Sequence, residues 1–273
     1  MSKKFFEHLN GSISYEDVGE GPLVITSHAL GDLRAEYRFL APKLVRSGFR
    51  VANMDLRGHG ESSTGWPDYS IAGTGADMIA LIRRLNAGPA LIVGTSFSAG
   101  AAVWAASEAP ELISGLVLIS PFIRDTMPVW QTKLLFTPLF SGPWGTTAWL
   151  KYFKTLYPSK PPADFNQYLS KLRQNLSQRG RLAAVRGMIT ASKSALDERL
   201  ARVSAPVLVI MGTRDPDFKD PAAEARLVAE KLDGEVHMIA GAGHHPHAEM
   251  PDETGPLIIA FAQKITQRQK QIA

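Results

Sequence analysis

Short apolar runs alternate with helical patterns along much of the chain, and this is the pattern of a parallel sheet covered by helices. The runs are rich in Val, Ile and Leu and are bounded by turn residues, as buried strands are. One earlier segment, residues 13–18, alternates apolar and polar positions and predicts an antiparallel strand. The predicted core strands are residues 23–27, 50–54, 90–93, 115–120, 206–211 and 235–239.

Apolar residues at helical spacing predict helices between these strands. Gly48 is placed to end the first helix, and Pro221 after Asp220 is typical of a capped helix start. We therefore predict an α/β fold with a mostly parallel sheet flanked by helices. The predicted helices are residues 37–47, 75–85, 222–232 and 256–267.

One interval is too long for an ordinary crossover, because about 85 residues separate the strands at 115–120 and 206–211. Helical patterns at 165–176 and 182–191 predict a helical cap there, inserted between two late strands. The predicted division is a core of residues 1–121 and 200–273 and a cap of residues 122–199. We expect one to three of its aromatic residues to face a substrate and the rest to pack the cap on the core: Phe136, Phe140, Trp144, Trp149, Tyr152, Phe153 and Tyr157.

Composition excludes several classes of protein. The 273 residues carry 30 Lys and Arg against 26 Asp and Glu, a net charge of only +4, which argues against a nucleic-acid partner. Hydrophobic residues make up 45% and charged residues 21%, as in globular proteins and unlike disordered chains. Cysteine is absent, so disulfides, thiolate metal sites and a cysteine nucleophile are excluded.

The sequence also carries expectations about location. The first ten residues lack the apolar stretch of a signal peptide, and no run approaches the roughly 20 apolar residues of a membrane-spanning helix. We therefore expect a cytoplasmic protein without stable membrane insertion. The sequence leaves the oligomeric state open.

The strongest chemical signal is the segment VGTSFSAG at residues 93–100, where a core strand runs directly into a helix of small residues. A serine on such a sharp turn needs small neighbours, and Gly94 and Ser98 supply them around Ser96. The helix start would also favour an anion forming above Ser96. Two alternatives are an ordinary Gly/Ser turn and a turn centred on Ser98, but the apolar strand already stops at Val93.

A serine nucleophile needs a base and a carboxylate that orients the base. His244 follows a glycine-rich turn after the last strand, and Asp215 follows the strand at 206–211. Two other aspartates could be the acid. We interpret Asp217 as a solvated loop residue and Asp220 as a helix N-cap.

The histidines at positions 244, 245 and 247 could instead indicate a metal site. Pro246 stiffens that run, however, and no carboxylate stands near it at ligand spacing along the sequence. We therefore expect no metal, and the chemistry calls for no organic cofactor.

Taken together, these motifs resemble the α/β-hydrolase superfamily, in its capped, esterase-like branch with a serine nucleophile. The order Ser96, Asp215, His244 matches the family's chain order. The segment DLRGHGES at 55–62 is similar to the family's D-x-R-G-x-G-x-S loop, residues 243–251 to its G-H-x-x-x-x-E-x-P segment, and SHALG at 27–31 to its oxyanion loop.

The resemblance implies roles for further residues. The backbone N–H groups of Leu30 and Phe97 would form the oxyanion hole. Ala29 stands where the family usually has glycine, which puts the conformation of that loop in question. Thr95 and Ser98 replace the more usual His and Gly beside the nucleophile. Arg57 and His59 are expected to stabilise their loop.

Related epoxide hydrolases and dehalogenases are expected to carry aspartate at the position of Ser96. A serine there implies acyl chemistry instead. We expect hydrolysis of small to medium carboxylic esters through an acyl-enzyme, with a small apolar ester as the partner molecule. A carbon–carbon bond hydrolase and a cofactor-free perhydrolase would share the same residues. A ligand sensor with little turnover is a further alternative.

Overall fold

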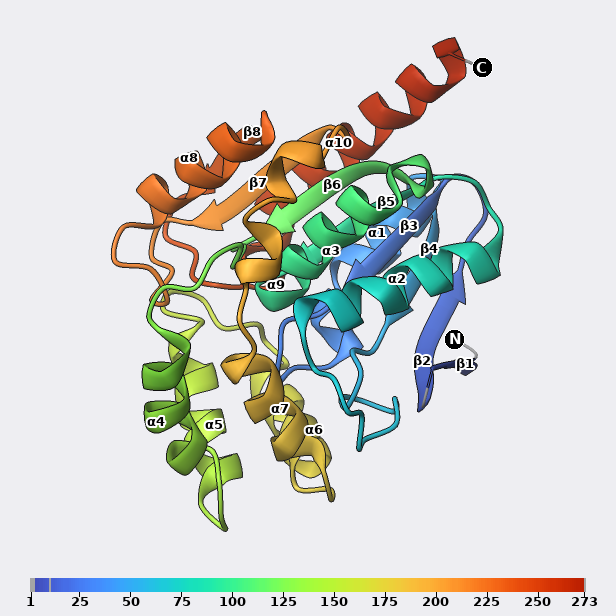
Figure 1. Ribbon diagram of the computed structural model, residues 1–273. Coiled ribbons are helices and arrows are strands. Elements are labelled where there is room, and N and C mark those ends of the chain that lie inside the picture. The colour runs from blue at the N-terminus through green and yellow to red at the C-terminus, as the bar shows by residue number, and fades with distance from the viewer. Residues whose placement is uncertain (1–2, 10, 273) are drawn as a thin grey trace.

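The computed structural model describes residues 3–9 and 11–272, so residues 1, 2 and 10 of the N-terminal segment lie outside the described part. Within it, eight strands form one sheet in the order β1-β2-β4-β3-β5-β6-β7-β8 (Figure 1). The strands are β1 (Lys3–His8), β2 (Gly11–Val18), β3 (Leu23–Ser27), β4 (Arg50–Met54), β5 (Ala90–Thr95), β6 (Ile113–Ile119), β7 (Val207–Gly212) and β8 (Glu235–Ile239).

The pairing pattern explains where a site can form. β1 and β2 are antiparallel to their neighbours, and the pairs from β4 to β8 are parallel. The predicted α/β class with a mostly parallel sheet is thereby confirmed. Because parallel strands end at the same edge, the loops after β3, β5, β7 and β8 come together there.

Helices cover both faces of the sheet because its strands are apolar on both sides. On β3, for example, Ile25 packs in the core shared with α2, α3 and α8, whereas Val24 packs in the core shared with α1 and α10. The helices are α1 (Leu40–Arg46), α2 (Ile71–Leu85), α3 (Phe97–Glu108), α8 (Pro221–Leu232), α9 (Pro246–Glu249) and α10 (Pro251–Ile272), with short 3-10 turns η1 (Arg34–Tyr37), η2 (Pro110–Leu112), η3 (Ser194–Leu196) and η4 (Leu200–Arg202).

Four further helices lie between β6 and β7, and we call them the inserted helices: α4 (Val129–Leu139), α5 (Gly145–Thr155), α6 (Phe165–Leu176) and α7 (Arg181–Thr190). They lie together beyond one edge of the sheet, past the ends of its strands (Figure 1). A separate hydrophobic cluster contains Trp149, Phe153, Leu172 and Val185, together with Ala248 of α9. Among the described helices, we find none with the length and apolar character that crossing a bilayer requires.

Several predicted boundaries differ from the structure. The predicted helix at 37–47 begins as the turn η1, so α1 proper starts at Leu40. α2 begins at Ile71, before the predicted 75, because the Ser70 side chain accepts a hydrogen bond from the Gly73 N–H. Gly73 sits inside this helix because a Cβ there would lie 2.4 Å from the Arg57 guanidinium. The strand β1 was not predicted, since only Phe6 is buried along it.

The turn from β5 into α3 is packed so closely that adding a methyl group at Gly94 should destabilise the protein. A Cβ on Gly94 would lie 2.7 Å from the Ser98 carbonyl oxygen and 2.9 Å from the Ala99 Cα. We expect Gly94→Ala to lower the free energy of unfolding by roughly 1–3 kcal/mol, because backbone must move to admit the methyl group. Urea unfolding measures this change.

Gly115→Ala in β6 is the matched control. Its new methyl group would meet only side chains, Leu91 at 3.1 Å and Ile265 at 3.3 Å, and alanine favours a strand over glycine by roughly 0.5–1 kcal/mol. The control is expected to lose less free energy of unfolding than Gly94→Ala, because side chains can move where backbone cannot. Equal stability of Gly94→Ala and the parent would contradict the tight approach of α3 to β5.

Candidate active site

Ser96 occupies the predicted strand-to-helix turn, with backbone angles φ 59° and ψ −116° between β5 and α3. Neighbouring backbone holds it there. The Ser96 N–H donates to the Ile119 carbonyl at 2.8 Å, and the Ser96 carbonyl accepts from the Phe122 N–H at 3.3 Å. The residue is 5% exposed and lines a cavity beneath the inserted helices. Its position on a strained strand-to-helix turn at the cavity wall matches the turn predicted from the sequence.

Ser98 has a different environment from Ser96. It is fully buried in the first turn of α3. Its Oγ accepts from the Thr95 N–H at 2.9 Å and lies 2.5 Å from the Ser27 carbonyl oxygen. Ser98 thus ties the turn to β3, and the alternative that centred the turn on it does not fit the structure.

His244 and Asp215 meet although they follow different strands. The His244 Nδ1 lies 2.8 Å from one Asp215 carboxylate oxygen and 3.0 Å from the other. Both residues are at most 2% exposed. A carboxylate on Nδ1 fixes the ring tautomer and leaves Nε2 for another partner. Ser96 and His244 line the same cavity.

A second carboxylate acts on this imidazole. Burial alone would lower the pKa of His244, but the Asp215 and Asp217 carboxylates outweigh it and raise that pKa to about 9. The Asp217 Oδ2 lies 3.6 Å from the His244 Nδ1. Burial would raise the pKa of Asp215, but the His244 imidazole lowers it overall.

The sequence interpretation of Asp217 as a solvated loop residue was wrong. Its side chain is only 14% exposed. Its two oxygens accept from the Tyr152 hydroxyl of α5 at 2.9 and 2.7 Å. An inserted helix therefore fixes a carboxylate beside His244. By contrast, Asp220 caps α8 as predicted, since its side chain accepts from the Ala223 N–H.

The loop after β3 presents backbone N–H groups near Ser96. The Ala29 N–H donates to Glu36 Oε2 at 2.7 Å, and the Gly31 N–H donates to His59 Nε2 at 2.9 Å. Between them, the Leu30 N–H has no acceptor among the residues that the structure describes. The Phe97 N–H opens α3, where an amide has no partner within the helix. Leu30 and Phe97 line the cavity with Ser96.

Alanine at position 29 does not strain this loop, because its φ is not positive. The left-handed position is Gly31, with φ +69°. A Cβ on Gly31 would lie 2.1 Å from the Trp149 ring, and the Trp149 indole N–H donates to the Gly31 carbonyl at 2.9 Å. The loop is therefore clamped from outside by α5.

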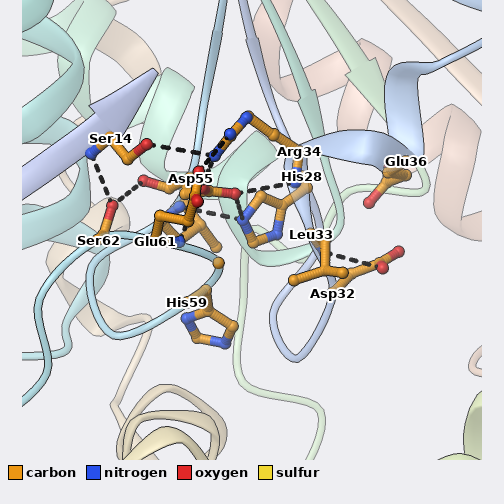
Figure 2. Close-up of polar contacts among 12 residues, drawn as sticks. Ser14, His28, Asp32, Leu33, Arg34, Glu36, Asp55, His59, Glu61 and Ser62 are labelled. Carbon is orange, nitrogen blue, oxygen red and sulfur yellow. Dashed lines mark hydrogen bonds and ion pairs between the residues drawn. The ribbon is translucent and has the colours of Figure 1, made fainter. Parts of the chain in front are cut away.

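Asp55 and Glu61 of the 55–62 segment lie beside His28 and Arg34, which follow β3 (Figure 2). The Asp55 carboxylate accepts from the Arg34 and Glu61 N–H groups, each at 3.0 Å. Arg57 pairs with the buried Asp77 at 2.8 Å, as expected for a loop-stabilising residue. The His59 Nε2 accepts from Gly31, and burial lowers the pKa of His59 to about 3, so its ring is neutral.

Sequence reasoning missed a buried group next to His244. The Glu36 Oε1 lies 2.9 Å from the His247 Nε2 and 3.6 Å from the His245 Nδ1, and all three side chains are fully buried. The carboxylate that meets these histidines is therefore one that spacing along the sequence does not reveal. Glu36 lies more than 200 residues earlier in the chain, and no local motif marks it.

Two groups of described residues bring ligand-type atoms within 4.8 Å of one another: Glu36, His245 and His247, and Asp215, Asp217 and His244. Imidazole and carboxylate are donors that transition metals accept. In the second group, Asp215 already engages the His244 Nδ1. In the first, the Ala29 N–H occupies Glu36 Oε2, while Oε1 faces the two imidazoles.

The cavity above Ser96 has a volume of about 320 Å³ and mostly apolar walls. Aromatic residues of α4 and α5 and the segment between them contribute to these walls. The expectation that one to three of them face a substrate stays a prediction. Of the seven aromatic residues considered, Trp144 is exposed at the surface, and Tyr157 stacks on His245 at 5.1 Å. The five that line the cavity are Phe136, Phe140, Trp149, Tyr152 and Phe153.

Comparisons with known proteins agree with this architecture. The sequence model described as "Alpha/beta hydrolase family" matches residues 24–255. The chain therefore belongs to the alpha/beta hydrolase family, and the predicted fold is confirmed.

Among similar proteins, a probable esterase of Oryza sativa subsp. japonica is 26% identical over 267 residues, 90% of this chain and 94% of that protein. The 3-oxoadipate enol-lactonase 2 of Acinetobacter baylyi is 25% identical over 245 residues, 88% of this chain and 89% of that protein. The crystal structure of a hydrolase from Pseudomonas aeruginosa superposes with a TM-score of 0.80 at 25% identity, over 95% of this chain and 98% of that one.

The position of Asp217 predicts its effect on the His244 ring. We expect Asp217→Asn to lower the pKa of His244 from about 9, because a negative charge that stabilises the imidazolium is removed. Asp215→Asn should lower it further, since Asp215 is closer and hydrogen-bonded. NMR titration of the ring measures both shifts.

Asp233→Asn serves as the control, because that exposed residue ends α8 in a left-handed conformation that asparagine tolerates. The pKa of His244 should not move in this variant. An unchanged pKa in Asp217→Asn would show that Asp217 does not act on the imidazole.

Proposed function

We propose that this protein is a serine hydrolase that cleaves small to medium carboxylic esters through an acyl-enzyme. The observation that carries the proposal is that Ser96, at a strained turn, shares one cavity with His244, whose Nδ1 is bonded to Asp215. In this proposal, Ser96 is the nucleophile, His244 the general base and Asp215 its orienting acid. Residues 122–199 act as a cap that selects the substrate.

Each group has a defined role in the proposed reaction. The His244 Nε2 takes the Ser96 proton while Oγ attacks the ester carbonyl carbon, and the carbonyl oxygen becomes an oxyanion. The N–H groups of Leu30 and Phe97 donate to that oxyanion. His244 then gives its proton to the departing alcohol. Water attacks the acyl-enzyme with His244 again as base, and the carboxylic acid leaves as Ser96 regains its proton.

The cavity supports an apolar acyl group of limited size. Its volume of about 320 Å³ is at the small end of the range for ligand pockets. Its walls carry five aromatic side chains, which favour an uncharged substrate. Two of the similar proteins are named an esterase and an enol-lactonase, and a lactone is a cyclic ester.

A fluorophosphonate probe tests the nucleophile. We expect Ser96→Ala to lose all labelling and ester hydrolysis, because Ser96 lines the cavity and the other hydroxyl residues of the turn, Thr95 and Ser98, do not. Ser98→Ala should keep labelling but be less stable, since its hydroxyl joins the turn to β3. Labelling measured by mass spectrometry identifies the modified residue, and a phosphonyl group on Ser98 would refute the assignment.

A substrate panel separates the remaining chemistries. Short and medium p-nitrophenyl esters should be hydrolysed and long ones should not, because the cavity is small. A carbon–carbon hydrolase would instead consume a vinylogous diketone and spare simple esters. A perhydrolase would need peroxide, and a sensor would label without turning over.

The pH dependence of kcat/KM follows from the His244 pKa. The base must be neutral to accept the Ser96 proton, and its carboxylate neighbours hold its pKa at about 9. We therefore expect kcat/KM for esters to rise with pH and to level off above about pH 9.

Asp217→Asn should move the rise of kcat/KM to lower pH, and Asp233→Asn should leave the profile unchanged. Asp215→Asn should reduce kcat by roughly 10⁴-fold with the fold intact, because the ring loses its tautomer control. A profile already level at neutral pH would contradict the stabilised imidazolium.

A further inference from the structure

The helix α4 presents large apolar side chains to the surface. None of its eleven residues, all of them within the described part of the chain, is buried. Trp130 is 64% exposed, Leu134 68% and Leu135 55%. Leu139 and Trp144 extend the same region, and the Trp144 indole N–H donates to the Pro138 carbonyl at 3.1 Å, which holds the ring at the end of the helix. Exposed apolar patches of this kind mark contact surfaces.

The opposite side of α4 lines the cavity. Thr132 and Phe136 face it, and Leu139 lies at the border between the cavity and the surface. At 100° per residue, Trp130, Leu134 and Pro138 follow one line along the helix, and Phe136 lies on the other side. One helix therefore separates the cavity above Ser96 from the exposed apolar surface.

Charge distinguishes the segment that contains α4 from the rest of the chain. Residues 126–163 contain no Asp or Glu, although the whole chain has 26 of them. The same segment holds four lysines, and all of them are exposed: Lys133, Lys151, Lys154 and Lys160. Lys133 lies on α4 itself, and the other three lysines lie on α5 and the segment after it. The apolar surface of α4 therefore carries one lysine and no acid.

We infer that α4 and its connection to α5, residues 129–144, dock on a lipid surface with anionic headgroups. Leucine side chains enter the acyl boundary, tryptophan prefers the headgroup level, and lysine pairs with anionic phosphates. A second copy of the chain fits less well. A two-fold contact would bring Lys133 and Leu134 of one copy against the same region of the other, with no acid in residues 126–163 to balance the lysines.

Docking on lipid would place the cavity wall at the membrane surface, where apolar esters concentrate. This consequence rests on the proposed function, but the docking itself does not. The binding assay contains no ester, and Ser96→Ala should bind vesicles as the parent does. Loss of catalysis and loss of docking are therefore separate results.

Sedimentation with vesicles tests the docking. We expect the protein to pellet with vesicles of phosphatidylcholine and phosphatidylglycerol, and far less with phosphatidylcholine alone. Emission of the exposed tryptophans should shift to shorter wavelength on binding. Trp130→Ser combined with Leu134→Ser should lower binding at least tenfold, while hydrolysis of a water-soluble ester stays unchanged because neither residue lines the cavity.

Matched controls use exposed residues outside the inserted helices. Phe5→Ser with Leu9→Ser removes two side chains that are 49% and 73% exposed near the N-terminus, and binding should persist. Lys133→Gln should weaken binding to the anionic vesicles about fivefold, whereas the exposed Lys231→Gln in α8 should not.

Three outcomes would overturn the inference. The first is no pelleting of the parent protein with anionic vesicles. The second is equal binding to both kinds of vesicle. The third is a concentration-dependent dimer in sedimentation velocity that Trp130→Ser with Leu134→Ser abolishes while vesicles remain unbound, because the second copy would then be the occupant.

Discussion

The left-handed backbone of Ser96 is the constraint around which the site is organised. A non-glycine residue in this region costs roughly 1–3 kcal/mol and persists only where its surroundings fix it. Here β6 and the segment after it hydrogen-bond both sides of the residue, and Gly94 leaves room for α3 to fold back against the strand. The same geometry places the open end of α3, with the Phe97 amide, next to the hydroxyl. The sheet thus creates the position of the serine and of one donor in a single turn.

Buried carboxylates, more than the sheet, hold the loops around that turn. Glu36 accepts from the Ala29 N–H, and Asp55 accepts from two N–H groups of neighbouring segments. Glu249 accepts from the Gly243 N–H at 2.7 Å and from the Ser159 and Lys160 N–H groups at 2.8 Å. Charge-assisted bonds of this kind are shorter and stronger than neutral ones. Each carboxylate therefore fixes a loop that the regular hydrogen bonds of the sheet do not reach.

The sequence predicted what is encoded locally and missed what is formed by distant residues. Small residues after an abrupt strand end identified the turn at Ser96, and helical periodicity predicted α6 with its observed bounds. Glu36 could not be found, because its partners lie at the other end of the chain and its own surroundings show no motif. Asp217 was misread because the tyrosine that covers it comes from α5. The helix α4 was not predicted, since it is apolar on most of its surface and shows no periodic polar face.

The inserted helices divide their tasks in a way that follows from their contacts. α5 makes two hydrogen bonds to the core, from Trp149 to the Gly31 carbonyl and from Tyr152 to the Asp217 carboxylate. Its position therefore fixes both the loop after β3 and the environment of His244. α4 makes no such polar contact with the core among the described residues, and Arg186 of α7 holds its end by donating to the Phe140 carbonyl at 2.8 Å. A helix with this arrangement can meet a lipid surface while the groups that α5 secures keep their geometry. The helix that supports the polar site, α5, is thus a different one from the helix that carries the apolar surface, α4. A change in the apolar surface need not disturb the polar site.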